Sequence, residues 1–195
     1  MGVLAGLSRQ LRLFTAILPT RQEQQAVAAL RRGWALPQQR LRPQVERLHL
    51  TLQFVADWPA ARLAVWQQAL AGLRFEPFDI VLARSERWRT PGGELLVLLP
   101  RACPALVALH AATEALARQA GVPAEPRAWR PHVTTLRGVA LPPGPLPVHP
   151  IRWHVDSVVL VCSEPERQPP RYRVLSRYPA PPDAVGRGRS SGGSR

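Results

Sequence analysis

Two short segments of the chain repeat one arrangement of a histidine and a threonine. In the segment ERLHLTLQF, His49 is followed two positions later by Thr51, and in the segment RPHVTTLR, His132 is followed two positions later by Thr134. Residues i and i+2 of a β-strand project from the same face, roughly 6.5 to 7 Å apart. Each imidazole therefore shares a face with a hydroxyl, while the leucines around His49 turn to the opposite face.

Two imidazoles and two hydroxyls around one ligand suit a reaction at phosphorus. Histidine has an ordinary pKa of about 6.5, so one imidazole can take a proton from an attacking oxygen while the other gives a proton to a leaving oxygen. Threonine hydroxyls can donate hydrogen bonds to the non-bridging phosphate oxygens. The pattern predicts acid/base catalysis of an in-line displacement that requires no metal ion and no cofactor.

The repetition carries more information than either motif. A single histidine before a threonine in an apolar strand is usually a packed or surface residue. With five histidines and seven threonines in the chain, two such arrangements arise by chance with a probability of roughly one in a hundred. The pair therefore indicates a site.

The elements expected to position these motifs are strands and helices in irregular alternation. Periodicity and turn residues predict strands at the second motif and over residues 11–18, 49–55, 78–88, 94–100, 151–164 and 171–179. Helices are expected over residues 21–35, 58–74 and 104–121, the last ended by Gly121. Hairpins between the helices favour an α+β fold with mostly antiparallel sheets. A helix precedes each motif strand, which suggests two lobes related by an approximate twofold axis around a central cleft.

Length and composition indicate one globular domain followed by a tail. With 195 residues, 46% of them hydrophobic, the chain can bury a core, and we expect a single bilobal domain over residues 1–178. Residues 179–195 contain too few apolar side chains to pack, so a disordered basic tail is expected there. Cys103 and Cys162 lack the spacing of a disulfide framework or a zinc site, which fits a reducing cytoplasm. No signal peptide or membrane anchor is visible.

The charge of the chain favours a polyanionic partner. The net charge is +13, and all 26 basic residues are arginine. Such an excess attracts phosphate groups and releases counterions, which makes nucleic acid the leading candidate. The alternative is a compositional bias toward Arg, Pro and Ala, with the arginines scattered over a solvated surface.

Four segments of the chain resemble the 2H phosphoesterases, and among them the bacterial and archaeal RNA 2′,3′-cyclic phosphodiesterases, also called 2′-5′ RNA ligases. The segments are RLFTAI, LHLTLQF, RPHVTTLR and VVLVCSEPERQPPRYRVLSRYP, and the resemblance covers roughly residues 11–178. It implies a bilobal, pseudo-twofold 2H phosphoesterase fold with both motifs in a central cleft. It also implies an enzyme that opens 2′,3′-cyclic phosphate ends of RNA to 2′-phosphates and can join tRNA half-molecules through 2′-5′ linkages in reverse.

The resemblance implies roles for six residues. His49 and His132 are the expected catalytic pair, the first as the acid toward the leaving 3′ oxygen and the second as the group that activates water. Phosphate and base would be bound by two hydroxyls, an arginine and an aromatic ring: Thr51, Thr134, Arg137 and Phe54. In a regular strand the arginine and the aromatic ring would face away from the histidines. A β-bulge or a strand end is therefore expected near them.

Two other functions fit the same residues. One is a non-catalytic module that binds RNA ends through the cleft and the basic tail. The other is a sibling 2H phosphodiesterase that acts on a small cyclic nucleotide or on ADP-ribose 1″,2″-cyclic phosphate. The implied partner of the enzyme is RNA with 2′,3′-cyclic phosphate termini, including tRNA fragments, and the implied protein is a cytoplasmic monomer.

Several further residues are expected to have structural roles. The other histidines lack an acidic pair at metal-ligand spacing and are assigned to the core or surface: His110, His149 and His154. Trp129 and Trp153 could stack on bases but are first expected in the core or at its rim. Arg130 either shares the face of His132 or forms a structural ion pair. Thr135 stands where the family has an apolar residue.

Overall fold

Eight strands and three α-helices make up the fold. The computed structural model describes residues 9–34, 43–125, 127–138, 145–167 and 171–181. The strands are β1 (Gln10–Ile17), β2 (Leu50–Pro59), β3 (Phe78–Thr90), β4 (Gly93–Pro100), β5 (Val133–Gly138), β6 (Ile151–Val155), β7 (Ser157–Glu164) and β8 (Arg171–Pro179). The helices are α1 (Arg21–Gly33), α2 (Leu63–Ala71) and α3 (Pro104–Gln119), with short 3-10 turns η2 (Val45–Arg47) and η3 (Ala60–Arg62). Most of the predicted tail lies outside the described residues.

The strands form one antiparallel sheet with two halves. Its order is β6-β3-β4-β5-β2-β1-β7-β8, and every neighbouring pair is antiparallel. The halves β6-β3-β4-β5 and β2-β1-β7-β8 meet at the two motif strands, where Leu50 pairs with Val133. The predicted α+β class with antiparallel pairing is confirmed, but the expected separate sheets are continuous through this pair.

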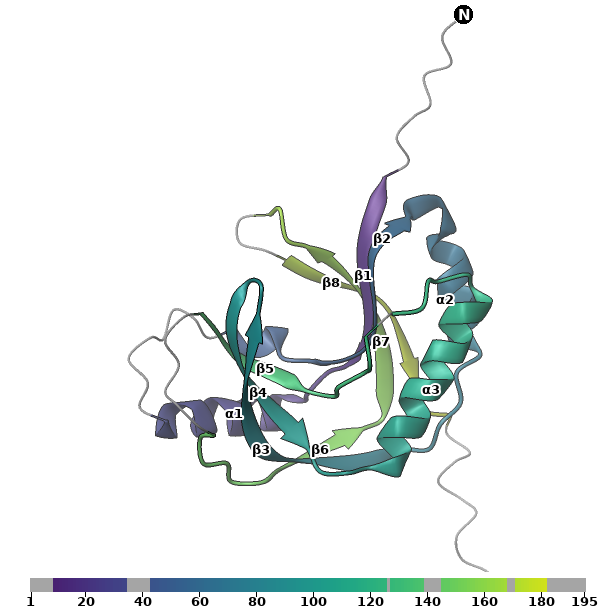
Figure 1. Cartoon of the computed structure of the whole chain (residues 1–195). Coiled ribbons are helices and arrows are strands. Elements are labelled where there is room, and N and C mark those ends of the chain that lie inside the picture. The colour runs from purple at the N-terminus through teal and green to yellow at the C-terminus, as the bar shows by residue number, and fades with distance from the viewer. Residues whose placement is uncertain (1–8, 35–42, 126, 139–144, 168–170, 182–195) are drawn as a thin grey trace, which may run out of the picture.

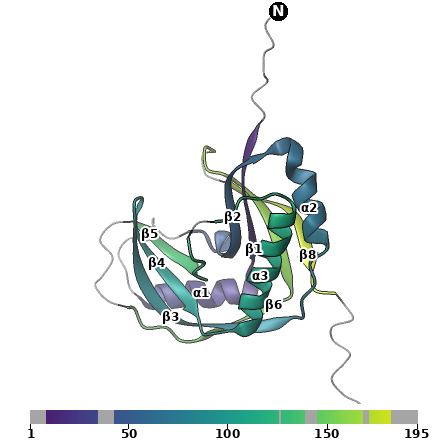
Figure 2. The same ribbon diagram turned by 45° about the vertical axis from the view of Figure 1, so that its right-hand side comes forward.

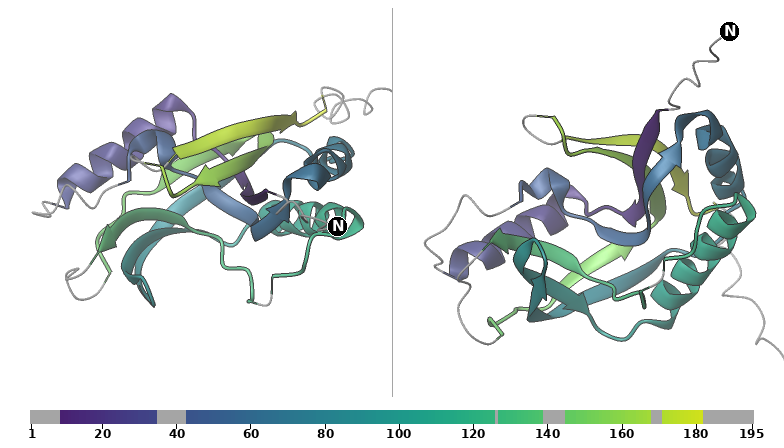
Figure 3. Two further views of the ribbon diagram at one scale, coloured as in Figure 1. Left: turned by 90° about the horizontal axis from the view of Figure 1, so that it is seen from above. Right: turned by 45° about the horizontal axis from the view of Figure 1, so that its top comes forward.

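The helices link the two halves. Helix α1 follows β1 in one half but packs against β6 in the other, and α3 follows β4 but packs against β2. Helices α2 and α3 lie side by side on the side of the molecule opposite α1 (Figures 1 and 2). The view from above in Figure 3 shows the same separation. Each half of the sheet is therefore covered by a helix that the other half supplies.

Local sequence signals set the ends of the helices. Thr20 caps α1 and forms a capping box with Glu23, while Pro104 occupies the first turn of α3. Gly121 adopts a φ of 78° after α3, as the sequence predicts for a helix end. The helix expected over residues 58–74 begins later, because β2 continues to Pro59 and η3 precedes α2.

The segment 151–164 corrects the sequence prediction of one strand. It is divided at Asp156 into β6 and β7, and these strands belong to opposite halves of the sheet. Strand β6 pairs with β3 at one edge, whereas β7 lies between β1 and β8. The burial patterns differ accordingly, since β6 alternates buried and exposed residues while five consecutive residues of β7 are buried. Strand-like residues on both sides of Asp156 did not reveal this change of partner.

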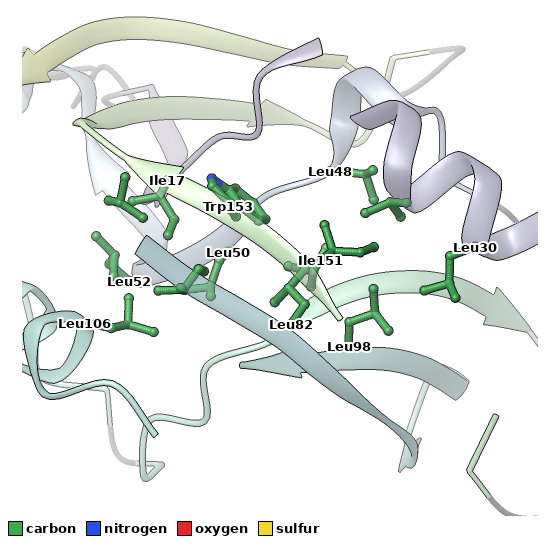
Figure 4. Packing of buried hydrophobic residues seen from close by; sticks show 14 of the residues in the cluster. Ile17, Leu30, Leu48, Leu50, Leu52, Leu82, Leu98, Leu106, Ile151 and Trp153 are labelled. Atoms are coloured by element: carbon green, nitrogen blue, oxygen red, sulfur yellow. The ribbon is translucent and has the colours of Figure 1, made fainter. Parts of the chain in front are cut away.

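The main core lies behind the histidine motif of β2. Leu48, Leu50 and Leu52 are all nearly or fully buried, as their alternation with His49 and Thr51 predicts. Figure 4 shows these leucines around a shared cluster of apolar side chains. Burying each leucine contributes about 2 kcal/mol, so hydrophobic packing holds the motif segment in place. Other members of this cluster come from α1, α3 and most of the strands: Ile17, Leu30, Leu82, Leu98, Leu106, Ile151 and Trp153.

We expect Glu23→Ala to lower the free energy of unfolding by about 2 kcal/mol, because three donors lose a buried charged acceptor. The Glu23 carboxylate accepts hydrogen bonds from the Thr20 amide and hydroxyl at 2.5 and 2.6 Å and from the His154 amide at 2.8 Å. Urea unfolding measures the loss. The matched control is Glu76→Ala at an exposed position, which should change stability by less than about 0.5 kcal/mol. Equal effects of the two substitutions would contradict this role of Glu23.

Candidate active site

Both histidine motifs open into one cleft of about 1180 Å³. Five of the six residues predicted for the site line it: His49, Thr51, Phe54, His132 and Arg137. Thr134 is half-buried on β5 and is not one of the residues that line the cleft. The cleft brings together segments separated by more than 80 positions in the sequence.

The sheet register relates the two motifs by an approximate twofold axis. Each histidine precedes the first residue of its strand, Leu50 in β2 and Val133 in β5, and these two residues pair across the sheet. The two motifs therefore occupy equivalent positions at the junction of the two halves, and each threonine follows the paired residue of its own strand by one position.

Backbone carbonyls fix the orientation of both imidazoles. The Nδ1 atom of His49 lies 2.7 Å from the Arg47 carbonyl oxygen, and Nδ1 of His132 lies 2.8 Å from the Arg130 carbonyl oxygen. A carbonyl oxygen can only accept a hydrogen bond, so Nδ1 carries the hydrogen in each ring. When neutral, each ring therefore has an unprotonated Nε2 as its available nitrogen. Two equivalent bases thus line one cleft.

Burial keeps both imidazoles neutral in the ligand-free protein. It lowers the pKa of His49 from 6.5 to about 4, with the positive charge of Arg137 acting in the same direction. Burial also lowers the pKa of His132, and Arg137 again contributes. Since a lowered pKa means that the proton leaves at a more acidic pH, both rings are unprotonated at neutrality. The electrostatic effect of Arg137 on both histidines places this cation near both.

A β-bulge in β2 places Phe54 in the cleft. Thr51 and Gln53 pair with successive residues of β1, so Leu52 is the extra residue between them. At this bulge, the backbone N–H of Gln53 donates a hydrogen bond to the Thr15 hydroxyl at 3.1 Å. One additional residue reverses the alternation of faces. Phe54 consequently joins Thr51 among the residues that line the cleft.

A bulge in β5 likewise places Arg137 in the cleft. Thr134 and Leu136 pair with successive residues of β4, and Thr135 is the extra residue. Its side chain is fully buried, and its hydroxyl donates to the Leu96 carbonyl oxygen at 2.8 Å. This hydrogen bond accounts for a polar side chain at a position where an apolar residue was expected. In regular strands Phe54 and Arg137 would face away from the histidines, and two bulges, one after each motif, turn them toward the cleft.

The cleft contains an excess of arginine over acidic residues. Among the described residues, Arg12, Arg47 and Arg137 line the cleft without forming an ion pair. Three other arginines at the cleft are paired with glutamates: Arg89 with Glu94, Arg127 with Glu125 and Arg130 with Glu86. Uncompensated cations in a partly buried cleft favour an anionic ligand.

The cleft also contains residues for which sequence patterns predict other roles or none. His110 was assigned to the core or surface, but it lines the cleft and stacks on Trp129 with ring centroids 4.0 Å apart. Tyr172 and Trp88 lie against the two motif histidines. Arg47 was not singled out, although both motifs share the longer pattern Arg-x-His-x-Thr. That repeated arginine was the available signal.

The remaining tryptophan and histidines considered as candidates lie away from the cleft. Trp153 is buried in the core, so it offers no face to a base. His149 is exposed, and His154 contacts Asp79 at 2.8 Å on the surface. In the described part of the chain, no group of three or more His, Cys, Asp or Glu side chains could hold a metal ion. None of the described helices is long and apolar enough to cross a membrane.

Comparison with known proteins agrees with this geometry. Residues 17–94 match the family model of LigT like phosphoesterases. The crystal structure of Escherichia coli LigT complexed with 3′-AMP is 24% identical, with a TM-score of 0.74 over 88% of this chain and 99% of that one. The crystal structure of a Thermus thermophilus protein, TT0787, is also 24% identical, with a TM-score of 0.71 over 87% of this chain and 97% of that one. No curated protein sequence matches significantly.

The chain therefore has the fold of the LigT-like phosphoesterases. The resemblance to this 2H phosphoesterase family that four sequence segments indicate is confirmed by the family-model match and by the structural match to E. coli LigT.

We expect nitrogen-15 NMR titration to find an Nδ1–H tautomer for both motif histidines, a pKa of about 4 for His49 and a pKa below 6.5 for His132. Arg137→Gln should raise both values, because it removes a positive charge that opposes protonation. Arg101→Gln, at an exposed arginine outside the cleft, is the matched control and should change neither. An Nε2–H tautomer or an unshifted pKa in either ring would refute this description of the site.

We expect Thr135→Val to lower the free energy of unfolding by about 1 to 2 kcal/mol, because the buried Leu96 carbonyl oxygen loses a donor. Valine keeps the volume and shape of threonine, so packing changes little. Thr90→Val removes a comparable hydrogen bond, 2.7 Å long and exposed, to the Gly93 carbonyl, and it should cost less than about 0.5 kcal/mol. Chemical unfolding of both variants provides the comparison, and equal losses would argue against a special role for the bulge.

Proposed function

We propose that the protein hydrolyses 2′,3′-cyclic phosphate ends of RNA to 2′-phosphomonoesters by acid/base catalysis between two histidines. The single observation that carries the proposal is the pair of imidazoles in one cleft, each with Nδ1 held by a backbone carbonyl. Such a pair can act on both ends of an in-line displacement at one phosphorus atom. By microscopic reversibility, the same groups would support 2′-5′ joining of RNA ends.

In this mechanism, one proton enters and one leaves the histidine pair. One imidazole takes a proton through Nε2 from water as the oxygen attacks phosphorus. The bond from phosphorus to the 3′ oxygen breaks, and the other imidazole gives that oxygen a proton. The phosphate remains on the 2′ oxygen. Following the resemblance, we assign His132 to the activation of water and His49 to protonation of the 3′ oxygen.

The positive charge of the cleft supports a phosphate ligand. Arg137 lies near both histidines and forms no ion pair within the described chain, so it is available to the non-bridging oxygens. Thr51 and Thr134 are the proposed hydroxyl donors. Bound phosphate offsets the charge of Arg137 and raises the pKa of the imidazoles, which allows one of them to hold the proton that it must give.

A nucleoside also finds suitable surfaces in the cleft. Phe54 is the proposed contact for the base, and the Arg12 guanidinium lies 4.6 Å from the centre of its ring. Crystal structures of E. coli LigT complexed with 3′-AMP, ATP and NADP+ show that this related protein binds nucleotides. Among these features, the excess of arginine favours an RNA end, with its additional phosphates, over a small cyclic nucleotide as the substrate.

The test is the incubation of an RNA oligomer that ends in a 2′,3′-cyclic phosphate, followed by chromatography and mass analysis. We expect a gain of one water and a 2′-phosphate, and His49→Ala or His132→Ala should lower kcat/KM by at least about 1000-fold. Hydrolysis should persist with a chelator present. Because both pKa values are lowered, the bell-shaped profile of kcat/KM should be centred below pH 6.5.

The outcomes separate the alternatives. Faster turnover of a cyclic mononucleotide than of the oligomer would favour the sibling phosphodiesterase. Tight, salt-sensitive RNA binding without turnover of either substrate would favour the non-catalytic module. Full activity of either alanine variant would overturn the paired mechanism. His149→Ala, at an exposed histidine outside the cleft, is the matched control and should retain the activity of the unsubstituted protein.

A further inference from the structure

The motif arginines contact the catalytic-pair histidines in two ways. Arg47 and Arg130 each precede a histidine by two residues, and the carbonyl of each accepts the Nδ1 hydrogen of that histidine. The guanidinium group of each arginine lies over an aromatic ring contributed by a distant strand.

On the first motif, the aromatic ring is Tyr172 of β8. The Arg47 guanidinium lies 4.5 Å from the centre of this ring, and the Tyr172 ring meets the His49 ring edge-on at a centroid distance of 5.4 Å. Phe14 completes this cluster of rings, with its ring centroid 4.8 Å from that of His49 and 5.2 Å from that of Tyr172. The Arg47 Nε atom is buried without a hydrogen-bond partner, and the guanidinium stacks on Tyr172.

On the second motif, the aromatic ring is Trp88 of β3. The Arg130 guanidinium lies 4.1 Å from the Trp88 ring, and the Trp88 and His132 ring centroids are 4.5 Å apart. Glu86 closes the group, because its Oε2 atom accepts from Trp88 Nε1 at 2.8 Å and lies 3.2 Å from the Arg130 guanidinium. The order arginine, aromatic ring, histidine is thus the same on both motifs.

We propose that Arg47 with Tyr172, and Arg130 with Trp88, are two equivalent brackets that hold the His49 and His132 rings in the orientation that directs Nε2 into the cleft. The four residues are positioning residues, since they act through the imidazoles. Their role in catalysis rests on the proposed function, but the ring orientation that they set does not.

Brackets are needed here because the strands end at the histidines. Both histidines precede their strands, and the two motif strands pair only through Leu50 and Val133 in the described sheet. Neither histidine therefore has backbone pairing of its own in the described sheet, whose ladders begin at Leu50 and Val133. Each bracket replaces it with two contacts that share one arginine: a carbonyl at the ring edge and an aromatic ring against which the imidazole packs.

Removing an aromatic ring tests a bracket without changing any charge. The charged groups that act on His49 are Arg47, Arg137 and His132, and those that act on His132 are Arg130 and Arg137, with Glu86 behind Trp88. Trp88→Leu and Tyr172→Leu remove none of these charges. A change in the titration of a histidine in these variants therefore reports its ring environment.

We expect Trp88→Leu to give His132 a mixed tautomer and a pKa closer to 6.5 while His49 titrates as before, and Tyr172→Leu to do the reverse. Nitrogen-15 NMR measures both rings in the intact chain. In the RNA assay, each variant should lower kcat by about 10-fold or more, with KM changed by less than about 3-fold. Tyr172→Phe keeps the ring and should restore both readouts. Val174→Ala, at an exposed position of β8, is the control for altering that strand.

The NMR titration and the activity assay test different claims and can fail independently. If the leucine variants leave both tautomers and both titrations unchanged, or disturb the two histidines equally, the brackets are refuted whatever the activity. If the unsubstituted protein turns over no cyclic phosphate, the proposed function fails while the titrations still decide the brackets. Should Trp88→Leu not fold, as judged by circular dichroism, Trp88→Met takes its place because its flexible, unbranched side chain adapts to the space that the indole leaves, and its expected and contradicting results are the same.

Discussion

The pairing of Leu50 with Val133 is the constraint on which the site depends. Within the described sheet, it is the one residue pair that joins β2 to β5 and thereby one half of the sheet to the other. Both partners are fully buried, so hydrophobic packing behind the cleft fixes their position. Because a histidine precedes each of them, the contact that joins the two halves of the sheet also brings the imidazoles together. Packing of the core therefore also positions the two motifs relative to each other.

The charge and the burial of the cleft oppose protonation of the histidines, and this opposition links ligand binding to proton uptake. Burial and Arg137 both lower the pKa values of His49 and His132. An anion bound beside Arg137 offsets one of these effects, so it raises the proton affinity of the imidazoles. By linkage, protonation of an imidazole must strengthen binding of the anion to the same extent. The proton that the proposed reaction requires is thus favoured mainly when a phosphate is present.

The sequence predicted the fold class and the convergence of the motifs because those features follow from local patterns and from repetition. Alternating leucines located the buried face of β2, and the two motifs indicated a pseudo-twofold cleft. The division at Asp156 was missed because the residues on both sides favour strands and the change of partner between β6 and β7 is a tertiary property. The bulges at Leu52 and Thr135 were expected only as a way to explain strand parity. Their exact positions depend on pairing with β1 and β4, which no local pattern encodes.

The twofold arrangement explains how the imidazoles reach opposite sides of one ligand, but the proposed reaction needs one acid and one base. The difference lies in the residue that packs beside each bracket, Phe14 in one case and Glu86 in the other. Buried Phe14 packs against His49, whereas half-buried Glu86 stands behind Trp88 and pairs with Arg130 near His132. The apolar neighbour desolvates His49 more completely, and the carboxylate leaves His132 in a more polar environment. A symmetric backbone with unequal neighbours can thus give two identical side chains different proton affinities. In the ligand-free protein this difference favours a proton on His132 over one on His49, so the proposed role of His49 as the acid depends on bound phosphate to raise its pKa.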